Sequence, residues 1–350
     1  MKKSIFLSFI LCLCLIACIP QQVMAQKQSR MEKLLRYLND NDADKWQKNR
    51  EKLDDETKAY YAEDLSLMDV LNDLWNGQSE QAATLYFGCY EKAAQSNFPG
   101  ICEGEKIPLS QIRDKADQSI INLLEASKDK IPFSRALLDS IHATEYPVDS
   151  AMLQRLQNIR EVALLEGMLK TPTPIIYQTY VKEYPNGKFI AQVNASENVR
   201  LYQLVKTAPT PANFKAFFED PEMQKYYQDR GPRPYLAEVR TLYDDFLFQR
   251  IDSLKKEGNA TAIRQIIDDY KNTPYLSTGA RTHLNDLEYL SEKADFELLK
   301  PAIVNSESLG LLQEFLKTHK YKEFRDQAKN LRAPFILQAI VSTPTTVKYY

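Results

Sequence analysis

The chain has 350 residues, of which 44% are hydrophobic, so it can bury a substantial core. Its 45 basic and 47 acidic residues leave a formal net charge of −2 and are interspersed, which gives no clustered basic face for nucleic acid. With only 10 glycines, the chain lacks the turn signals that recur about every 8–12 residues in β-sandwiches and barrels, so we expect helix throughout.

The first 25 residues are typical of an export signal. Lys2 and Lys3 form the positive end, and an apolar run follows from Ile5 to Ile19. This run is shorter than the ~20 residues that span a bilayer, so a transmembrane anchor is not expected. Small and branched residues then precede a predicted cleavage before Gln26. The protein is therefore expected in the periplasm or at the outer membrane.

A second interpretation of the same segment stays open. Leu15-Ile16-Ala17-Cys18 resembles the bacterial lipobox, in which residues 1–17 are removed and Cys18 is lipidated. Contact with a membrane is then expected only through this lipid.

Two cysteines follow the signal, which itself contains Cys12, Cys14 and Cys18. An oxidising compartment would allow Cys89 and Cys102 to form a disulfide, and two free thiols are the alternative.

Residues 26–109 are predicted to form N-terminal helical hairpins. Apolar and aromatic residues recur there at helical spacing, and Asn76-Gly77 separates the first set from the second. Asp54 and Ser79 are predicted caps of helix N-termini. Residues 97–109 contain two prolines and two glycines and are predicted to be a loop. The apolar positions are Leu34, Leu35, Leu38, Tyr60, Tyr61, Leu65, Met68, Leu71, Leu74, Trp75, Ala82, Ala83, Tyr86, Phe87 and Tyr90.

Residues 110–170 are predicted to be connecting helices. The pattern predicts helices near 110–128, 132–143 and 149–170, separated by Ile131-Pro132 and Tyr146-Pro147.

Residues 171–350 contain a degenerate repeat with a period in the mid-forties and a C-terminal cap. In each copy an apolar triplet is followed by a turn and then by a small residue that is expected to anchor a second helix. The triplets are Tyr177-Tyr180-Val181, Phe214-Phe217-Phe218, Ile263-Ile266-Ile267 and Leu312-Phe315-Leu316, and the small residues are Ala191, Ala237, Ala280 and Ala328.

The copy from Tyr177 to Val193 resembles the tetratricopeptide-type hairpins of bacterial (Bacteroidetes-type) cell-envelope proteins. Tyr184-Pro185 ends its first helix, and Asn186-Gly187 allows the turn. The resemblance covers about half of the chain. It implies an all-α fold, a right-handed α-solenoid of stacked helical hairpins, and a role in binding other proteins.

No constellation of catalytic or metal-binding residues stands out. His142, His283 and His319 lack a metal-ligand spacing. Adjacent acids on a helix, such as Asp268-Asp269, point in different directions and therefore do not face a single substrate bond as a glycosidase pair must. We therefore expect no enzyme activity, no cofactor and no metal.

Residues 221–235 interrupt the repeat where a hairpin loop should be short. Insertions in repeat arrays often lie on the functional face, and tyrosine and arginine dominate binding hot spots. The candidate partner-binding residues are Tyr226, Tyr227, Arg230, Arg233 and Tyr235.

The sequence thus favours an exported, non-catalytic scaffold or adaptor that binds other cell-envelope proteins. Two alternatives stay open. One is a glycan- or nutrient-binding accessory protein or lipoprotein in which Trp46 or Trp75 stacks on a sugar, and the other is a helical hydrolase.

Overall fold

The computed structural model describes residues 23–77, 79–257 and 260–342. Helices dominate these ranges and no strand occurs within them, which confirms the all-α class. Across the same ranges, no helix combines the length and the apolar character needed to cross a bilayer. The apolar run of the predicted export signal and Cys18 lie outside the described residues.

The chain divides into two compact units, which we call unit 1 and unit 2. Unit 1 ends at Ser196, and unit 2 begins at Glu197. The division falls inside helix α11 (Ile190–Thr207), so one helix contributes to both units.

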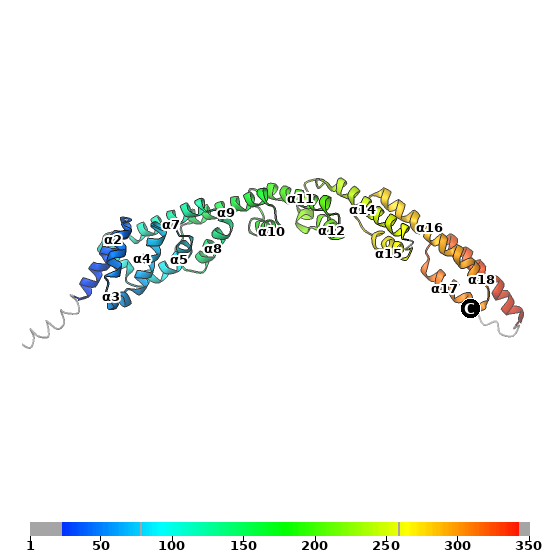
Figure 1. The fold of residues 1–350 in the computed structure, drawn as a ribbon, viewed down its shortest axis with the longest axis horizontal. Helices are drawn as coiled ribbons and strands as arrows, with labels where there is room; N and C mark the ends of the chain where they lie inside the picture. The colour runs from blue at the N-terminus through cyan, green and yellow to red at the C-terminus, as the bar shows by residue number, and fades with distance from the viewer. Residues whose placement is uncertain (1–22, 78, 258–259, 343–350) are drawn as a thin grey trace, which may run out of the picture. The chain divides into compact units, whose positions relative to one another are not determined.

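The described part of unit 1 begins with a helix over residues 23–39 (Figure 1). The helices that follow are α2 (Ala43–Glu51), α3 (Asp55–Tyr60), α4 (Ala62–Trp75), α5 (Glu80–Ala94), α6 (Phe98–Gly104), α7 (Leu109–Ala126), α8 (Lys130–His142), α9 (Ser150–Lys170) and α10 (Pro174–Glu183). The predicted helices near 110–128, 132–143 and 149–170 are thereby confirmed as α7, α8 and α9.

Most of the apolar positions predicted for residues 26–109 lie in one core. This core extends from Met31 to Leu156. Tyr60 differs, because the helix breaks at Tyr61 between α3 and α4 and leaves Tyr60 49% exposed. Trp75 also differs, being half-buried with the Nζ atom of Lys115 at 3.9 Å from its ring centre.

Both predicted helix caps are confirmed. The Asp54 carboxylate accepts a hydrogen bond from the Thr57 amide at 2.7 Å, and the Ser79 hydroxyl accepts one from the Ala82 amide at 3.2 Å. Each cap satisfies a backbone donor that the helix itself leaves unpaired.

The prediction of a loop over residues 97–109 is wrong for residues 98–104, which form α6, whereas residues 105–108 do connect α6 to α7 without a helix. Pro99 lies in the first turn of α6, where a missing amide hydrogen costs nothing. Phe98, Ile101 and Cys102 are buried on one side of this short helix. The preceding turn is held by Ser96, whose hydroxyl donates to the buried carboxylate of Asp64.

A polar contact lies within the aromatic part of the unit 1 core. The Tyr146 hydroxyl donates to Oδ1 of Asp117 at 2.6 Å, and the Tyr86 hydroxyl lies 3.4 Å from that of Tyr146. Asp117 is only 7% exposed. Burial therefore raises the pKa of its carboxyl group to about 6, although Tyr146 and Arg113 oppose the shift.

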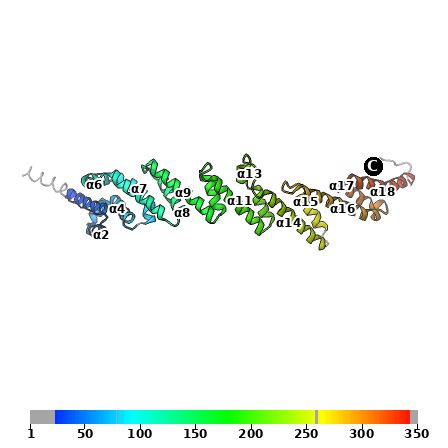
Figure 2. The ribbon, with the colours of Figure 1, turned by 90° about the horizontal axis from the view of Figure 1, so that it is seen from above.

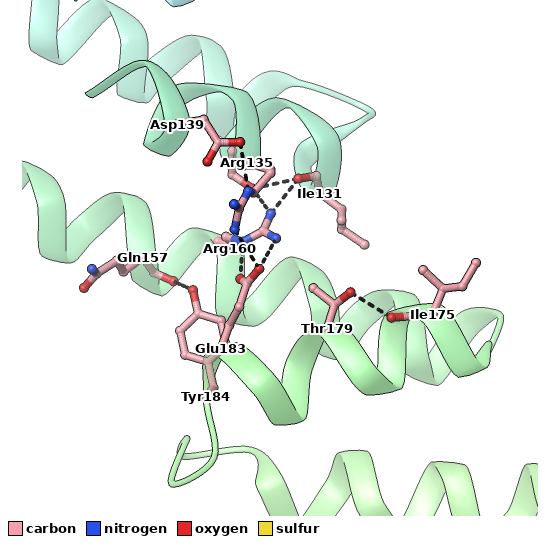
Figure 3. Close-up of polar contacts among 10 residues, drawn as sticks. Ile131, Arg135, Asp139, Gln157, Arg160, Ile175, Thr179, Glu183 and Tyr184 are labelled. Carbon is pink, nitrogen blue, oxygen red and sulfur yellow. Dashed lines mark hydrogen bonds and ion pairs between the residues drawn. The ribbon is translucent and has the colours of Figure 1, made fainter. Parts of the chain in front are cut away.

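A buried arginine connects α8, α9 and α10 (Figure 3). Arg160, on α9, forms a two-pronged ion pair with Glu183 of α10, with nitrogen–oxygen distances of 2.6 and 2.9 Å. Its third nitrogen donates to the carbonyl of Ile131 at 2.7 Å and to Ser134 at 3.2 Å. Burial alone would raise the pKa of Glu183, but Arg160 and Arg135 outweigh it and hold that pKa below its usual value.

The predicted turn at Gly187 brings the chain close to two polar side chains. The Tyr180 hydroxyl donates to Glu161 at 2.8 Å and accepts from the Phe189 amide at 3.1 Å. A Cβ atom on Gly187 would lie 2.6 Å from that hydroxyl and 2.5 Å from the Glu161 carboxylate. The glycine is therefore required here by close approach rather than by backbone conformation.

Unit 2 continues from the second part of α11. Its helices are α12 (Pro211–Glu219), α13 (Pro221–Tyr227), α14 (Leu236–Lys256), α15 (Ala260–Tyr270), α16 (Thr278–Ala302), the short 3₁₀ helix η1 (Ser306–Ser308), α17 (Leu309–Thr318) and α18 (Lys322–Ser342). Helices α17 and α18 lie side by side in Figures 1 and 2, and both contact α16.

The repeated apolar triplets face inward, on α10, α12, α15 and α17. Phe214, Phe217 and Phe218 are all buried, and in the other three copies two of the three side chains are buried and the third is half-buried. The triplets therefore form the packing face of the shorter helix in each copy.

The prediction that four alanines anchor the longer helices is wrong for two of them. Ala280 and Ala328 are buried, whereas Ala191 and Ala237 are exposed. Two residues further along, Val193 and Val239 are each 0% exposed. A branched side chain, rather than a small one, forms the contact in these two copies.

Candidate partner-binding surface

Residues 221–235 form a helix and a turn rather than a simple loop. Asp220 caps α13 by accepting the Met223 amide at 2.8 Å, and Pro221 occupies its first turn. Met223 is 0% exposed and fixes the helix to the rest of unit 2. The insertion is therefore an ordered part of the fold.

Arg233 is the buried anchor of this segment, so its prediction as a partner-contacting residue is wrong. Its Nε donates to the Asn198 side chain at 2.6 Å, and its Nη1 donates to the carbonyl of Phe217. The guanidinium lies 3.9 Å from the centre of the Phe217 ring. Asn198 also donates to the carbonyl of Pro234 at 3.2 Å, so α11 holds the segment at two neighbouring points.

Tyr226, Tyr227 and Arg230 lie together where α13 ends. The two tyrosine rings meet edge to face at 5.0 Å, and the Arg230 guanidinium lies 4.4 Å from the centre of the Tyr226 ring. Arg230 also donates to the Tyr226 carbonyl at 2.9 Å. Arg230 is exposed and both tyrosines are half-buried; burial raises the pKa of Tyr227.

Tyr235 stacks on Tyr202 of α11. Their ring centres are 4.4 Å apart and the planes differ by 11°. Tyr235 has a left-handed backbone with φ of 64°, and its side chain remains 40% exposed. The hydroxyl of Tyr202 donates to Glu238 and accepts from Lys206 at 3.3 Å, so the ring beneath Tyr235 is itself fixed.

We call Tyr226, Tyr227, Arg230 and Tyr235 the tyrosine–arginine surface. Tyr226 packs against Tyr227 and Arg230, and Tyr235 stacks on Tyr202, which limits the conformational entropy that these side chains would lose when a partner binds. Sequence reasoning missed the supporting residues Asn198 and Tyr202, because they lie about 35 positions earlier and carry no local signal.

The histidines do not gather into one site. His142 and His283 are exposed, and His319 contacts Asp295 at 3.1 Å and stacks on Phe315. Within the part of the chain that the structure describes, no three metal-ligating side chains come together.

Cys89 and Cys102 are free thiols. Cys102 is 1% exposed, and burial raises its pKa to about 12. The sulfur of Cys89 lies 3.6 Å from the Ser66 hydroxyl. The structure thus contains two free thiols rather than a disulfide between Cys89 and Cys102.

Trp46 is 1% exposed within the unit 1 core. It cannot stack on a sugar in this state, which removes one of the two tryptophans on which the glycan-binding alternative depends.

Comparison with known proteins gives no relative: no protein-family model, no curated protein and no solved structure matches this chain.

Proposed function

We propose that the helix pairs of this protein stack as a right-handed, tetratricopeptide-like α-solenoid with a period in the mid-forties. The buried triplets support this proposal, because each shorter helix buries one apolar face against its neighbours. Contacts between α8 and α9, α14 and α15, and α17 and α18 are of the kind that such pairs make.

The function that we propose is that of an exported, non-catalytic scaffold that binds other cell-envelope proteins. The tyrosine–arginine surface is the observation that carries it. Arg230 and Tyr235 are exposed, Tyr226 and Tyr227 are half-buried, and Arg233 anchors the segment that carries them. Tyrosine and arginine in such a setting fit the chemistry of a binding hot spot. The export signal with cleavage before Gln26, or lipidation of Cys18, would deliver the protein to the periplasm or the outer membrane.

The test is capture of partners by a variant in which Tyr226→Ala, Arg230→Ala and Tyr235→Asn are combined. Asparagine is chosen because it tolerates the left-handed backbone of Tyr235. Cross-linked co-purification from the native envelope should recover at least one envelope protein with the wild-type chain, and the variant should recover much less of it. Circular dichroism should show unchanged helix content.

A matched control replaces an exposed tyrosine and an exposed arginine elsewhere, with Tyr60→Ala and Arg250→Ala. It should capture the partner as the wild type does. Equal recovery with all three chains would remove the tyrosine–arginine surface from the proposal, and recovery of no partner by the wild type would overturn the scaffold function. A Cys18→Ser chain run in parallel reports whether capture depends on lipidation.

A further inference from the structure

Two neighbouring hollows lie along helices α7 and α9 of unit 1. The first has a volume of about 490 Å³ and is lined by both helices, including Asp117 and Met152. The second has a volume of about 230 Å³ and is lined mainly by α9, including Ile159 and Val162. Since α7 and α9 are in contact, we call these hollows together the α7–α9 seam.

One face of α9 runs along both hollows. Met152, Arg155, Ile159, Val162 and Glu166 recur at steps of three or four residues, so their side chains share one side of the helix. Arg155 lines the first hollow and Glu125 the second, and their side chains form an ion pair at 2.8 Å. This pair forms the boundary between the hollows.

The first hollow is acidic. Asp117, at 7% exposure, accepts a hydrogen bond from Tyr146 through Oδ1 alone. Asp114 and Asp149 also line the hollow. Two arginines line the same hollow: Arg155 is paired with Glu125, and the Nε atom of Arg113 lies 3.6 Å from Asp114. The hollow therefore has an excess of negative charge.

The N-terminus of α9, next to the first hollow, does not offer free backbone amides to an anion either. Asp149 caps α9 by accepting the amides of Ala151 and Met152 at 3.1 and 3.3 Å, which occupies backbone donors that an anion would otherwise need. A cation is thus the ligand that the first hollow fits.

The second hollow has both apolar and acidic lining. Ile159, Val162 and Ala163 are half-buried or buried, while Glu125 and Glu166 are exposed and Lys130 is the basic residue that lines it. An aliphatic side chain would bury apolar surface there.

We propose that the α7–α9 seam binds an extended segment of a partner protein, with a lysine or arginine side chain in the first hollow and an aliphatic side chain in the second. Met152 and Val162 are ten residues apart on α9, or about 15 Å along its axis. An extended chain covers that distance in about five residues. This inference goes beyond the proposed function, because it requires neither unit 2 nor the tyrosine–arginine surface.

The experiment uses the chain that begins at Gln26 and a fluorescein-labelled peptide with blocked ends. The peptide carries one arginine and, about five residues later, one leucine, joined by glycine and serine. We expect it to bind at least ~10-fold more tightly, by fluorescence anisotropy, than the same peptide with glutamate in place of arginine. Asp114→Lys and Val162→Asp, which alter one hollow each, should each weaken binding ~10-fold.

The matched control is Asp252→Lys, the same charge reversal at an exposed position of unit 2, which should leave the affinity unchanged. Equal binding of the arginine and glutamate peptides, or no binding of either, would overturn the proposal. So would displacement of the peptide by N-acetylarginine amide at comparable concentration, because the seam would then be a site for a small cation. None of these outcomes affects the co-purification assay, since the variant tested there for loss of partner capture alters residues of unit 2 alone.

Discussion

Asp117 is a buried residue whose protonation should affect the stability of unit 1. Its folded pKa of about 6 lies above the ordinary value of 3.8, so between these values the folded state holds more proton than the unfolded state. The free energy of unfolding must therefore fall as the pH rises through this window. The shift corresponds to roughly 2–3 kcal/mol.

Asp117→Asn tests this directly. Asparagine keeps an oxygen that can accept the Tyr146 hydroxyl but cannot ionise. Compared with this variant, the wild type should lose roughly 2–3 kcal/mol of stability between about pH 4 and pH 7. Urea unfolding followed by the fluorescence of Trp46 and Trp75, which both lie in unit 1, measures the difference. Parallel pH profiles for the two chains would contradict the assignment.

At the scale of elements, the Arg160–Glu183 pair determines how α8, α9 and α10 pack. Removing one partner of a buried ion pair leaves the other uncompensated, and Arg160→Ala should therefore destabilise unit 1 by about 3–5 kcal/mol. The same urea experiment at neutral pH measures this loss. Since the pKa of Glu183 is lowered, the contribution of the pair should shrink as the pH falls below about 4.5.

Arg135→Ala is the control for that substitution. The Arg135 side chain is 56% exposed and lies 3.3 Å from the same carboxylate. Exposed pairs contribute at most about 1 kcal/mol, so this change should cost far less. A loss as large as that of Arg160→Ala would show that burial is not the deciding factor.

Sequence periodicity predicted the elements that depend on interactions between residues close together in the sequence. The triplets, the caps at Asp54 and Ser79, and helices α7 to α9 all follow from spacing or from a capping side chain. The helix at residues 98–104 was predicted to be a loop because proline and glycine suit both a loop and a short helix. Tertiary contacts with Asp64 and the core decide between these two structures.

The candidate site was predictable only in part, for a related reason. An insertion rich in tyrosine and arginine is visible in the sequence, but the burial of Arg233 depends on Asn198 and Phe217, which are distant in the chain. The α7–α9 seam was not predicted at all, because it joins side chains of two helices whose pairing no local pattern specifies.

At the scale of the molecule, the two units should differ in local stability. One continuous core covers Met31 to Leu156 in unit 1, whereas the cluster that joins α16, α17 and α18 contains six buried apolar residues among those that the structure describes. Local opening costs less where fewer apolar contacts break. Amide hydrogen exchange should therefore be slower in α4, α5 and α7 than in α17 and α18. Equal protection in both sets would contradict this difference.

The two thiols of unit 1 differ in burial, so they should react with a thiol reagent at different rates. In a chain that begins at Gln26, Cys89 and Cys102 are the only cysteines. Cys89 is half-buried, while Cys102 is buried within α6 and its pKa of about 12 keeps it protonated at neutral pH. A maleimide should therefore modify Cys89 first, and the delay before a second mass increment appears would record how often the region around α6 opens.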